Sequence, residues 1–278
     1  MENTISRREF IRTVAVGAGG ALCAGLGANM LQGCRKVPLT DRMQLAIPAL
    51  AMNALGATSY VETLASSKLS TKRPTEKSWV KNSGSNISGA VESYLREAGR
   101  SSLINGFSWQ FELIEDDVVN AWCMPGGRIA FYEGIMPLCK DETGVAVVMG
   151  HEIAHAVANH SGERMLLQLS IQLGGMALST ALEKEPEKTR QIALYVFGVG
   201  SQLGATLPYS RKHEYEADKM GLIFMAMAGY DPRQAPEFWE RMPKGSTPQF
   251  LSTHPSHGNR IQRLNEAMPE AMQYYSGR

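Results

Sequence analysis

The stretch that decides the fold is Gly150-His151-Glu152-Ile153-Ala154-His155. On a helix, His151 and His155 lie four residues apart on one face, with Cβ atoms about 5–6 Å apart, so both imidazoles reach one metal ion. Glu152 lies about 100° round the helix, where its carboxylate can take a proton from an attacking water molecule. The apolar residues 145–149 directly before the motif suit a helix packed into the core. We therefore predict a zinc helix rather than a pair of surface histidines.

A catalytic zinc site needs a third protein ligand. Some metalloproteases carry a third zinc-binding histidine ten residues after the first. His160 lies one residue short of that position, so we interpret it as a helix-end or core histidine. Glu214 and Asp218 lie four residues apart on one predicted helical face, so Glu214 can bind zinc while Asp218 orients a zinc-binding histidine. Glu216 points about 200° away from Glu214, and we expect it to be solvated or in a salt bridge. Spacing alone would also allow a solvated charged face at residues 213–218.

The amino terminus carries an export signature. Ser6-Arg7-Arg8-Glu9-Phe10-Ile11 is a twin-arginine motif, and the uncharged run after it ends in Leu31-Gln32-Gly33-Cys34, which resembles a lipobox. An uncleaved membrane anchor is the alternative, but the glycines of this run make a poor helix. We predict a signal peptide over residues 1–33, an acylated Cys34 as the new first residue, and a periplasm-facing lipoprotein. Because Arg35 rather than aspartate follows Cys34, we expect anchoring in the outer membrane.

The composition excludes some classes of protein. The 278 residues include 28 basic and 27 acidic side chains, so the chain has no basic excess with which to bind nucleic acid. Hydrophobic residues make up 44% and charged residues 20% of the chain, which argues against disorder. Cys123 and Cys139 remain besides the lipobox cysteine once the signal is removed; they form either a disulfide or two buried thiols.

Hydrophobic periodicity predicts a mostly helical chain with a few strands. Two uncharged stretches, residues 165–182 and 191–210, flank a charged tip and predict a helical hairpin. Their polar residues favour burial against protein or contact with a membrane surface over true membrane spans. We expect a helical region over 34–105 that shares one domain with a catalytic region over 106–278. The other predicted helices are residues 46–64, 80–98, 143–162, 211–228, 232–241 and a last one after 258, and the predicted strands are 107–113, 118–124 and 128–132.

Four motifs together resemble the family-48 zinc metallopeptidases, which include the CAAX prenyl proteases, HtpX, and Oma-type and LoiP/BepA-type peptidases. The matching pieces span about residues 117–263: Met124-Pro125-Gly126-Gly127-Arg128-Ile129, Gly150 to His155, Glu214 to Asp218, and Ser252-Thr253-His254-Pro255 with Arg260. The resemblance implies an α+β, mostly helical, zincin-like (gluzincin) fold with a small sheet beside the zinc helix. It also implies one Zn²⁺ held by His151, His155 and Glu214, Glu152 as general base, and Asp218 behind a histidine ligand.

The same resemblance places His254 and Arg260 beside the metal. Both side chains can donate hydrogen bonds to the oxyanion that develops on the scissile carbonyl. Alternatively, neutral His254 can act as a fourth zinc ligand that silences the enzyme. A satisfied loop histidine is the third interpretation of His254. We predict latency with a weak catalytic contribution.

These features predict a zinc endopeptidase of the cell envelope that degrades misfolded or misassembled envelope and outer-membrane proteins. We expect a substrate to add as an extended strand along residues 127–131, with Pro125, Gly126, Gly127, Arg128 and Ile129 as the substrate strand; a plain hairpin turn is the alternative for Pro125 to Gly127. The expected partners are polypeptide substrates, the membrane through Cys34, and the outer-membrane assembly machinery.

A chaperone-like lipoprotein with structural zinc and a zinc amidase are rival interpretations. Structural zinc sites usually have four ligands, mostly cysteine, so a base beside the metal and remote cysteines favour catalysis.

Overall fold

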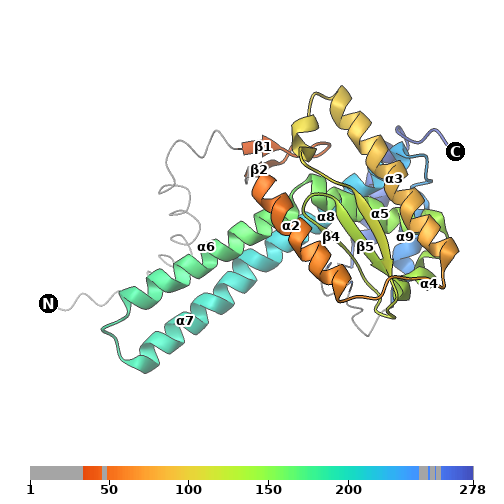
Figure 1. The fold of residues 1–278 in the computed structure, drawn as a ribbon. Helices are drawn as coiled ribbons and strands as arrows, with labels where there is room; N and C mark the ends of the chain where they lie inside the picture. The colour runs from red at the N-terminus through yellow and green to blue at the C-terminus, as the bar shows by residue number, and fades with distance from the viewer. Residues whose placement is uncertain (1–33, 46–48, 244–249, 251–253, 255–257, 278) are drawn as a thin grey trace.

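The computed structural model describes residues 34–45, 49–243, 250, 254 and 258–277. These residues form a body of helices around a small sheet, from which one helical hairpin protrudes (Figure 1). The predicted export signal over residues 1–33 lies outside the described residues. The first described residues form a short antiparallel pair, β1 (Cys34–Lys36) and β2 (Met43–Leu45), which the sequence did not indicate.

Three strands form the sheet of the body: β3 (Gln110–Ile114), β4 (Ala121–Met124) and β5 (Arg128–Tyr132). Their order is β3-β5-β4, with β3 parallel and β4 antiparallel to β5. The turn between β4 and β5 contains Gly126 and Gly127 at φ of 87° and 82°, a backbone conformation that glycine adopts without steric cost. All three strands agree with the prediction, and the Pro-Gly-Gly segment is the turn of a hairpin.

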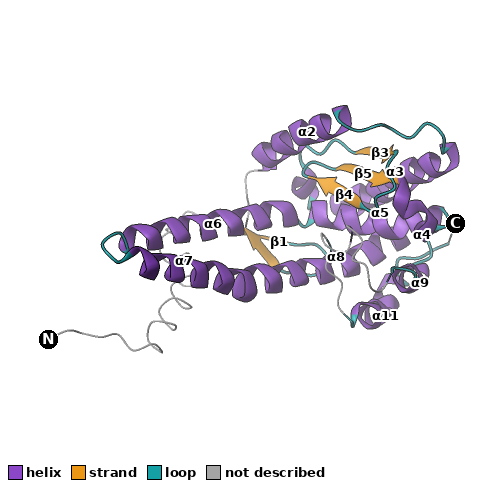
Figure 2. Cartoon of the chain, turned by 90° about the horizontal axis from the view of Figure 1, so that it is seen from below, coloured by secondary structure: helices purple, strands orange, loops and turns teal. Residues whose placement is uncertain are grey.

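Helices cover both faces of this sheet. Figure 2 shows α2 (Ala49–Ala65) on one side of the strands and α5 (Glu142–Val157) on the other. The expected α+β, mostly helical architecture with a small sheet beside the zinc helix is confirmed. The remaining helical elements of the body are α3 (Pro74–Glu97), η2 (Ser101–Ile104), η3 (Glu133–Ile135), α4 (Met136–Cys139), α8 (Leu207–Met227), α9 (Gln234–Glu240) and α11 (Arg260–Ala271).

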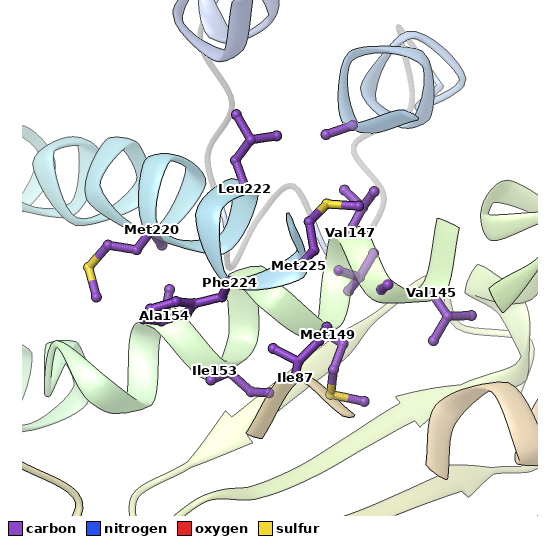
Figure 3. Packing of buried hydrophobic residues seen from close by; sticks show 14 of the residues in the cluster. Ile87, Val145, Val147, Met149, Ile153, Ala154, Met220, Leu222, Phe224 and Met225 are labelled. Carbon is purple, nitrogen blue, oxygen red and sulfur yellow. The ribbon is translucent and has the colours of Figure 1, made fainter. Parts of the chain in front are cut away.

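The centre of the core is the contact between α5 and α8. The Asp141 side chain caps α5 by accepting a 2.9 Å hydrogen bond from the Gly144 backbone N–H. Where the two helices cross, their backbones almost touch: a Cβ added to Gly150 would lie only 2.6 Å from the carbonyl oxygen of Gly221. Above and below this crossing the helices interlock through buried apolar side chains. Figure 3 shows buried apolar side chains from both helices in this core, among them Ala154 of α5 and Phe224 of α8.

The chain leaves α5 by a sharp break. Asn159 has a φ of 53°, in the left-handed region that asparagine tolerates better than most residues. A new helix, α6 (His160–Ala181), begins directly after it. The predicted single helix over residues 143–162 is therefore wrong at its end, because Asn159 redirects the chain.

Helices α6 and α7 (Glu187–Ser201) form the predicted hairpin, which returns through the π-helical turn η4 (Gln202–Thr206) into α8. Large apolar side chains on it are exposed, for example Met176 at 66% and Tyr195 at 73%. The prediction that these stretches are buried against protein is therefore wrong. Their contact with a membrane surface stays a prediction. Among the described helices, none combines the length and apolar character that a membrane span requires.

One apolar core joins the two parts of the chain. It contains Val80 and Ile87 from the region before residue 106 together with Phe131, Met149 and Phe224 from the region after it. Cys123 and Cys139 are both free thiols, and Cys139 is buried. The structure thus agrees with the thiol interpretation rather than the disulfide.

Candidate metal centre

Four side chains gather where α5 and α8 cross. His151 and His155 come from one face of α5, Glu214 comes from α8, and His254 comes from the segment before α11. One potential ligand atom from each lies within 4.8 Å of the others, and all four residues are buried. The spacing of four residues thus brings the two histidines together as predicted, and helix packing adds Glu214.

The distances between these atoms fit a tetrahedral zinc ion. His151 Nε2 lies 3.0 Å from His155 Nε2 and 3.3 Å from Glu214 Oε2, and His155 Nε2 lies 3.4 Å from Glu214 Oε1. Nitrogen and oxygen ligands about 2.0–2.1 Å from a tetrahedral zinc are roughly 3.4 Å apart, so one ion fits between them. Among the described residues, Oε1 of the buried Glu214 has no hydrogen-bond partner. A cation would satisfy that atom, and the donor set is one that zinc prefers.

The second nitrogen of His151 is held from behind. Its Nδ1 lies 3.0 Å from Oδ1 of Asp218, which fixes the ring so that Nε2 faces the other ligands. This is the position predicted for Asp218. Arg260 in turn donates a 2.5 Å hydrogen bond to Asp218 and stacks over Trp239 with its guanidinium carbon 3.3 Å from the ring centroid. Arg260 therefore lies behind His151, and its predicted hydrogen bond to a substrate oxyanion stays a prediction.

His254 lies inside the ligand group. Its Nδ1 is 3.2 Å from His151 Nε2 and 3.3 Å from Glu214 Oε2, distances that suit a fourth ligand. Its Nε2 is 3.4 Å from Oε1 of Glu152, and its ring stacks on Phe250. Glu152 is 1% exposed, and its Oε1 has no hydrogen-bond partner in the described part of the chain. The predicted base and the predicted latency residue are thus adjacent.

Burial and neighbouring charges set the protonation of the ligand side chains. Burial disfavours the charged form of His151, but hydrogen bonds to Asp218 and Glu214 outweigh it and raise its pKa to about 9. Burial lowers the pKa of His155 well below its ordinary value. Burial raises the pKa of Glu214, but the neighbouring histidines lower it by more. The pKa of Glu214 therefore lies well below its ordinary value. Glu214 is therefore an ionised carboxylate, as a metal ligand must be.

The prediction that a substrate adds as an extended strand along residues 127–131 is wrong. β5 is the central strand, paired with β3 on one side and β4 on the other, so residues 127–131 offer no free edge. The physical reason is the parallel pairing of β3 with β5, which the sequence does not reveal. β4 is the edge strand next to α5. The pKa of its Cys123 thiol is raised by burial and by the nearby charge of Glu152.

His160 is a buried histidine at the start of α6 and Glu216 forms a salt bridge, as predicted, but the sequence did not indicate that both lie behind the ligand His155. His160 is fully buried, and its Nδ1 lies 2.8 Å from Nδ1 of the ligand His155. Its Nε2 lies 2.9 Å from Glu216, which forms an ion pair with Arg42 of the β1–β2 loop. The only signal in the sequence was a histidine five residues after His155, and the helix break at Asn159 turns that residue back toward the ligand.

Comparison with known proteins agrees with this geometry. The family model described as Peptidase family M48 matches residues 85–268. The mitochondrial metalloendopeptidase OMA1 of Schizosaccharomyces pombe is 35% identical over 190 residues, covering 66% of this chain and 53% of that protein. The human metalloendopeptidase OMA1 is 32% identical over 179 residues, covering 61% of this chain and 34% of that protein.

The Escherichia coli beta-barrel assembly-enhancing protease is 27% identical over 177 residues, which cover 59% of this chain and 36% of that protein. The chain thus spans between about a third and about half of the length of these relatives. The matched residues contain His151, His155 and Glu214, the three ligands of the zinc site. With its family match extending over more than half of its residues, the chain belongs to Peptidase family M48.

Proposed function

We propose that the chain is a zinc metalloendopeptidase that degrades misfolded or misassembled proteins of the cell envelope. The observation that carries the peptidase assignment is the convergence of His151, His155 and Glu214 on one point with the buried carboxylate of Glu152 beside it. The family and its relatives named as metalloendopeptidases support the reaction class.

Glu152 is the proton-transfer group of the proposed reaction. Zinc at such a site acts as a Lewis acid that polarises a carbonyl and lowers the pKa of water. The carboxylate of Glu152 accepts the proton of the attacking water and delivers it to the amine that leaves. Its Oε1 has no hydrogen-bond partner among the described residues, so the atom is available to accept that proton.

Asp218 and His254 prepare the site from opposite sides. Asp218, held by Arg260, keeps the His151 ring in the orientation that presents Nε2. His254 lies where it occupies a fourth ligand position and contacts Glu152. We propose that this arrangement is a resting state, and that His254 must move before a substrate carbonyl can enter.

The substrate is proposed to bind as an extended chain along the edge strand β4. Backbone hydrogen bonds to a strand edge accept many sequences, which suits an enzyme that removes damaged proteins. β4 packs against α5, the helix that carries Glu152, so a peptide on this edge would pass close to the base.

Location in the envelope is supported by the sequence motifs Arg7-Arg8 and Leu31-Gln32-Gly33-Cys34. One of the relatives is named a beta-barrel assembly-enhancing protease, which is in keeping with an envelope role and with the outer-membrane assembly machinery as a partner. Mass spectrometry of the protein from a membrane fraction should find an acylated Cys34 at the amino terminus. An intact Met1 there would contradict the lipoprotein proposal.

A chaperone-like function is favoured by one observation, the exposed apolar side chains of the α6–α7 hairpin. Cleavage of casein separates the two functions, because a chaperone with structural zinc cuts nothing. We expect the zinc-loaded chain to cut casein and the Glu152→Gln variant to leave it intact. In cells, envelope proteins that accumulate with Glu152→Gln but not with the wild type identify the substrates; an unchanged set of envelope proteins would contradict the quality-control role.

A further inference from the structure

The two zinc-binding histidines have different partners behind them. His151 Nδ1 faces the carboxylate of Asp218 directly. His155 Nδ1 faces instead another imidazole, with Nδ1 of His160 at 2.8 Å. A metal-binding histidine nearly always donates its second N–H to an oriented partner, and that partner fixes the ring.

Behind His160 the contacts continue to a carboxylate. His160 Nε2 lies 2.9 Å from Glu216 Oε2, and this oxygen also accepts a 2.7 Å hydrogen bond from Arg42 Nε. The other oxygen of Glu216 accepts a hydrogen bond from the hydroxyl of Thr40. Arg42 also pairs with Glu163, at 2.9 Å, so its charge is shared between two carboxylates. His160 is 0% and Glu216 6% exposed, so water does not compete strongly for these bonds.

The hydrogen atoms along this path can have only one arrangement when His155 binds a metal ion. Nε2 of His155 faces the ligand group, so a neutral His155 carries its proton on Nδ1 and donates it to His160. His160 Nδ1 is then the acceptor, and its proton lies on Nε2, from which it is donated to Glu216. Glu216 accepts from three donors, one each on His160, Arg42 and Thr40, and donates to none of them.

We infer that His160 and Glu216 are positioning residues for the zinc ligand His155, with His160 in its Nε2–H tautomer and Arg42 holding Glu216. Asp218 orients the zinc ligand His151 directly. Glu216 does the same for His155, but acts through the intervening imidazole of His160. This inference rests on the zinc site of the proposed function and is independent of its substrate. It also gives the β1–β2 loop, which carries Thr40 and Arg42, a role in the geometry of the metal site.

The chain offers a matched control in His213. Its ring stacks on His160 with centroids 4.1 Å apart, and it is equally buried at 1% exposure. Its Nε2 bonds to Glu163 in the same charged cluster, but among the described residues it forms no hydrogen bond with His155. Replacing His213 therefore disturbs the same part of the core without removing the acceptor of the His155 proton.

The test measures zinc affinity of the full chain by competition with a chromophoric chelator. His160→Phe keeps a ring of similar shape but leaves the His155 Nδ1–H without an acceptor, so we expect zinc affinity to fall about 10- to 100-fold. His160→Asn restores an acceptor oxygen near His155, and we expect it to recover most of that loss. His213→Phe should bind zinc within about twofold of the wild type. Equal affinities of His160→Phe and the wild type, or equal losses in His160→Phe and His213→Phe, would overturn the inference.

A second measurement needs no variant. Nitrogen-15 NMR of the histidine side chains of the zinc-loaded wild type reports which ring nitrogen carries a proton. We expect a proton on Nδ1 of His155 and on Nε2 of His160; a proton on Nδ1 of His160 would overturn the inference even if the variants fail to fold. A wild type that binds no zinc would instead contradict the proposed function.

Discussion

Gly221→Ala tests whether the close approach of α5 and α8 builds the zinc site. A Cβ on Gly221 would lie 2.7 Å from the backbone nitrogen and 2.9 Å from the Cα of His151, and 2.8 Å from the carbonyl carbon of Gly150. All three are backbone atoms, so no side chain can rotate away. Ordinary contact begins at about 3.5 Å, so the helices must separate by roughly 0.8 Å.

That separation is large compared with the tolerance of a zinc site. α5 carries His151 and His155, whereas α8 carries Glu214, so moving the helices apart pulls the carboxylate from the imidazoles. Zinc–ligand distances vary by only about 0.2 Å between working sites. We expect zinc affinity to fall at least tenfold. Overpacking of a core costs about 1–3 kcal/mol, which corresponds to a fall in Tm of roughly 2–12 °C.

The assays are thermal unfolding of the metal-free chain and chelator competition for zinc. Gly89→Ala is the matched control: Gly89 lies in α3, and a Cβ there meets nothing within 4 Å. Loss of a flexible glycine from a helix should stabilise that variant by about 0.5–1 kcal/mol and leave zinc affinity unchanged. If the Gly221→Ala variant has the same Tm and the same zinc affinity as the wild type, this contact does not set the ligand geometry.

Four further expectations follow from the site. Glu152→Gln should retain zinc by metal analysis but cut casein about 10²- to 10⁴-fold more slowly, because the proton acceptor is gone; an undiminished rate would remove Glu152 as the base. Glu214→Ala should lose zinc, since two histidines hold it weakly, and full occupancy would show the ligand assignment to be wrong. His254→Ala should cut casein and itself faster if His254 enforces latency; slower cutting would favour the oxyanion role, and unchanged cutting would exclude both. Because zinc must displace the proton of His151, whose pKa is about 9, apparent zinc affinity should rise about tenfold per pH unit from 7 to 9 and then level off; a flat profile would contradict the raised pKa.

Local pattern was enough to predict most elements and the two histidine ligands. The two histidines and Glu152 take their places from helical periodicity alone, and strand β5 agrees with its predicted bounds of residues 128–132. Glu214 was chosen from its spacing to Asp218 and assigned as a ligand through the family resemblance. These features were predictable because each depends on neighbours a few residues apart.

Only the tertiary structure decided what lies around the ligands. The order β3-β5-β4 places β4 rather than β5 at the edge, because the pairing partner of a strand is not encoded within the strand. The break at Asn159 turns His160 back onto His155, and packing of α8 and the β1–β2 loop brings Glu216 and Arg42 behind it. The sequence by itself determined that His151 and His155 face one metal ion, since one turn of helix suffices to align them. Their support depends on contacts between different segments, such as His160 with Glu216, 56 residues apart, and Glu216 with Arg42, 174 residues apart, and only the folded core brings those segments together.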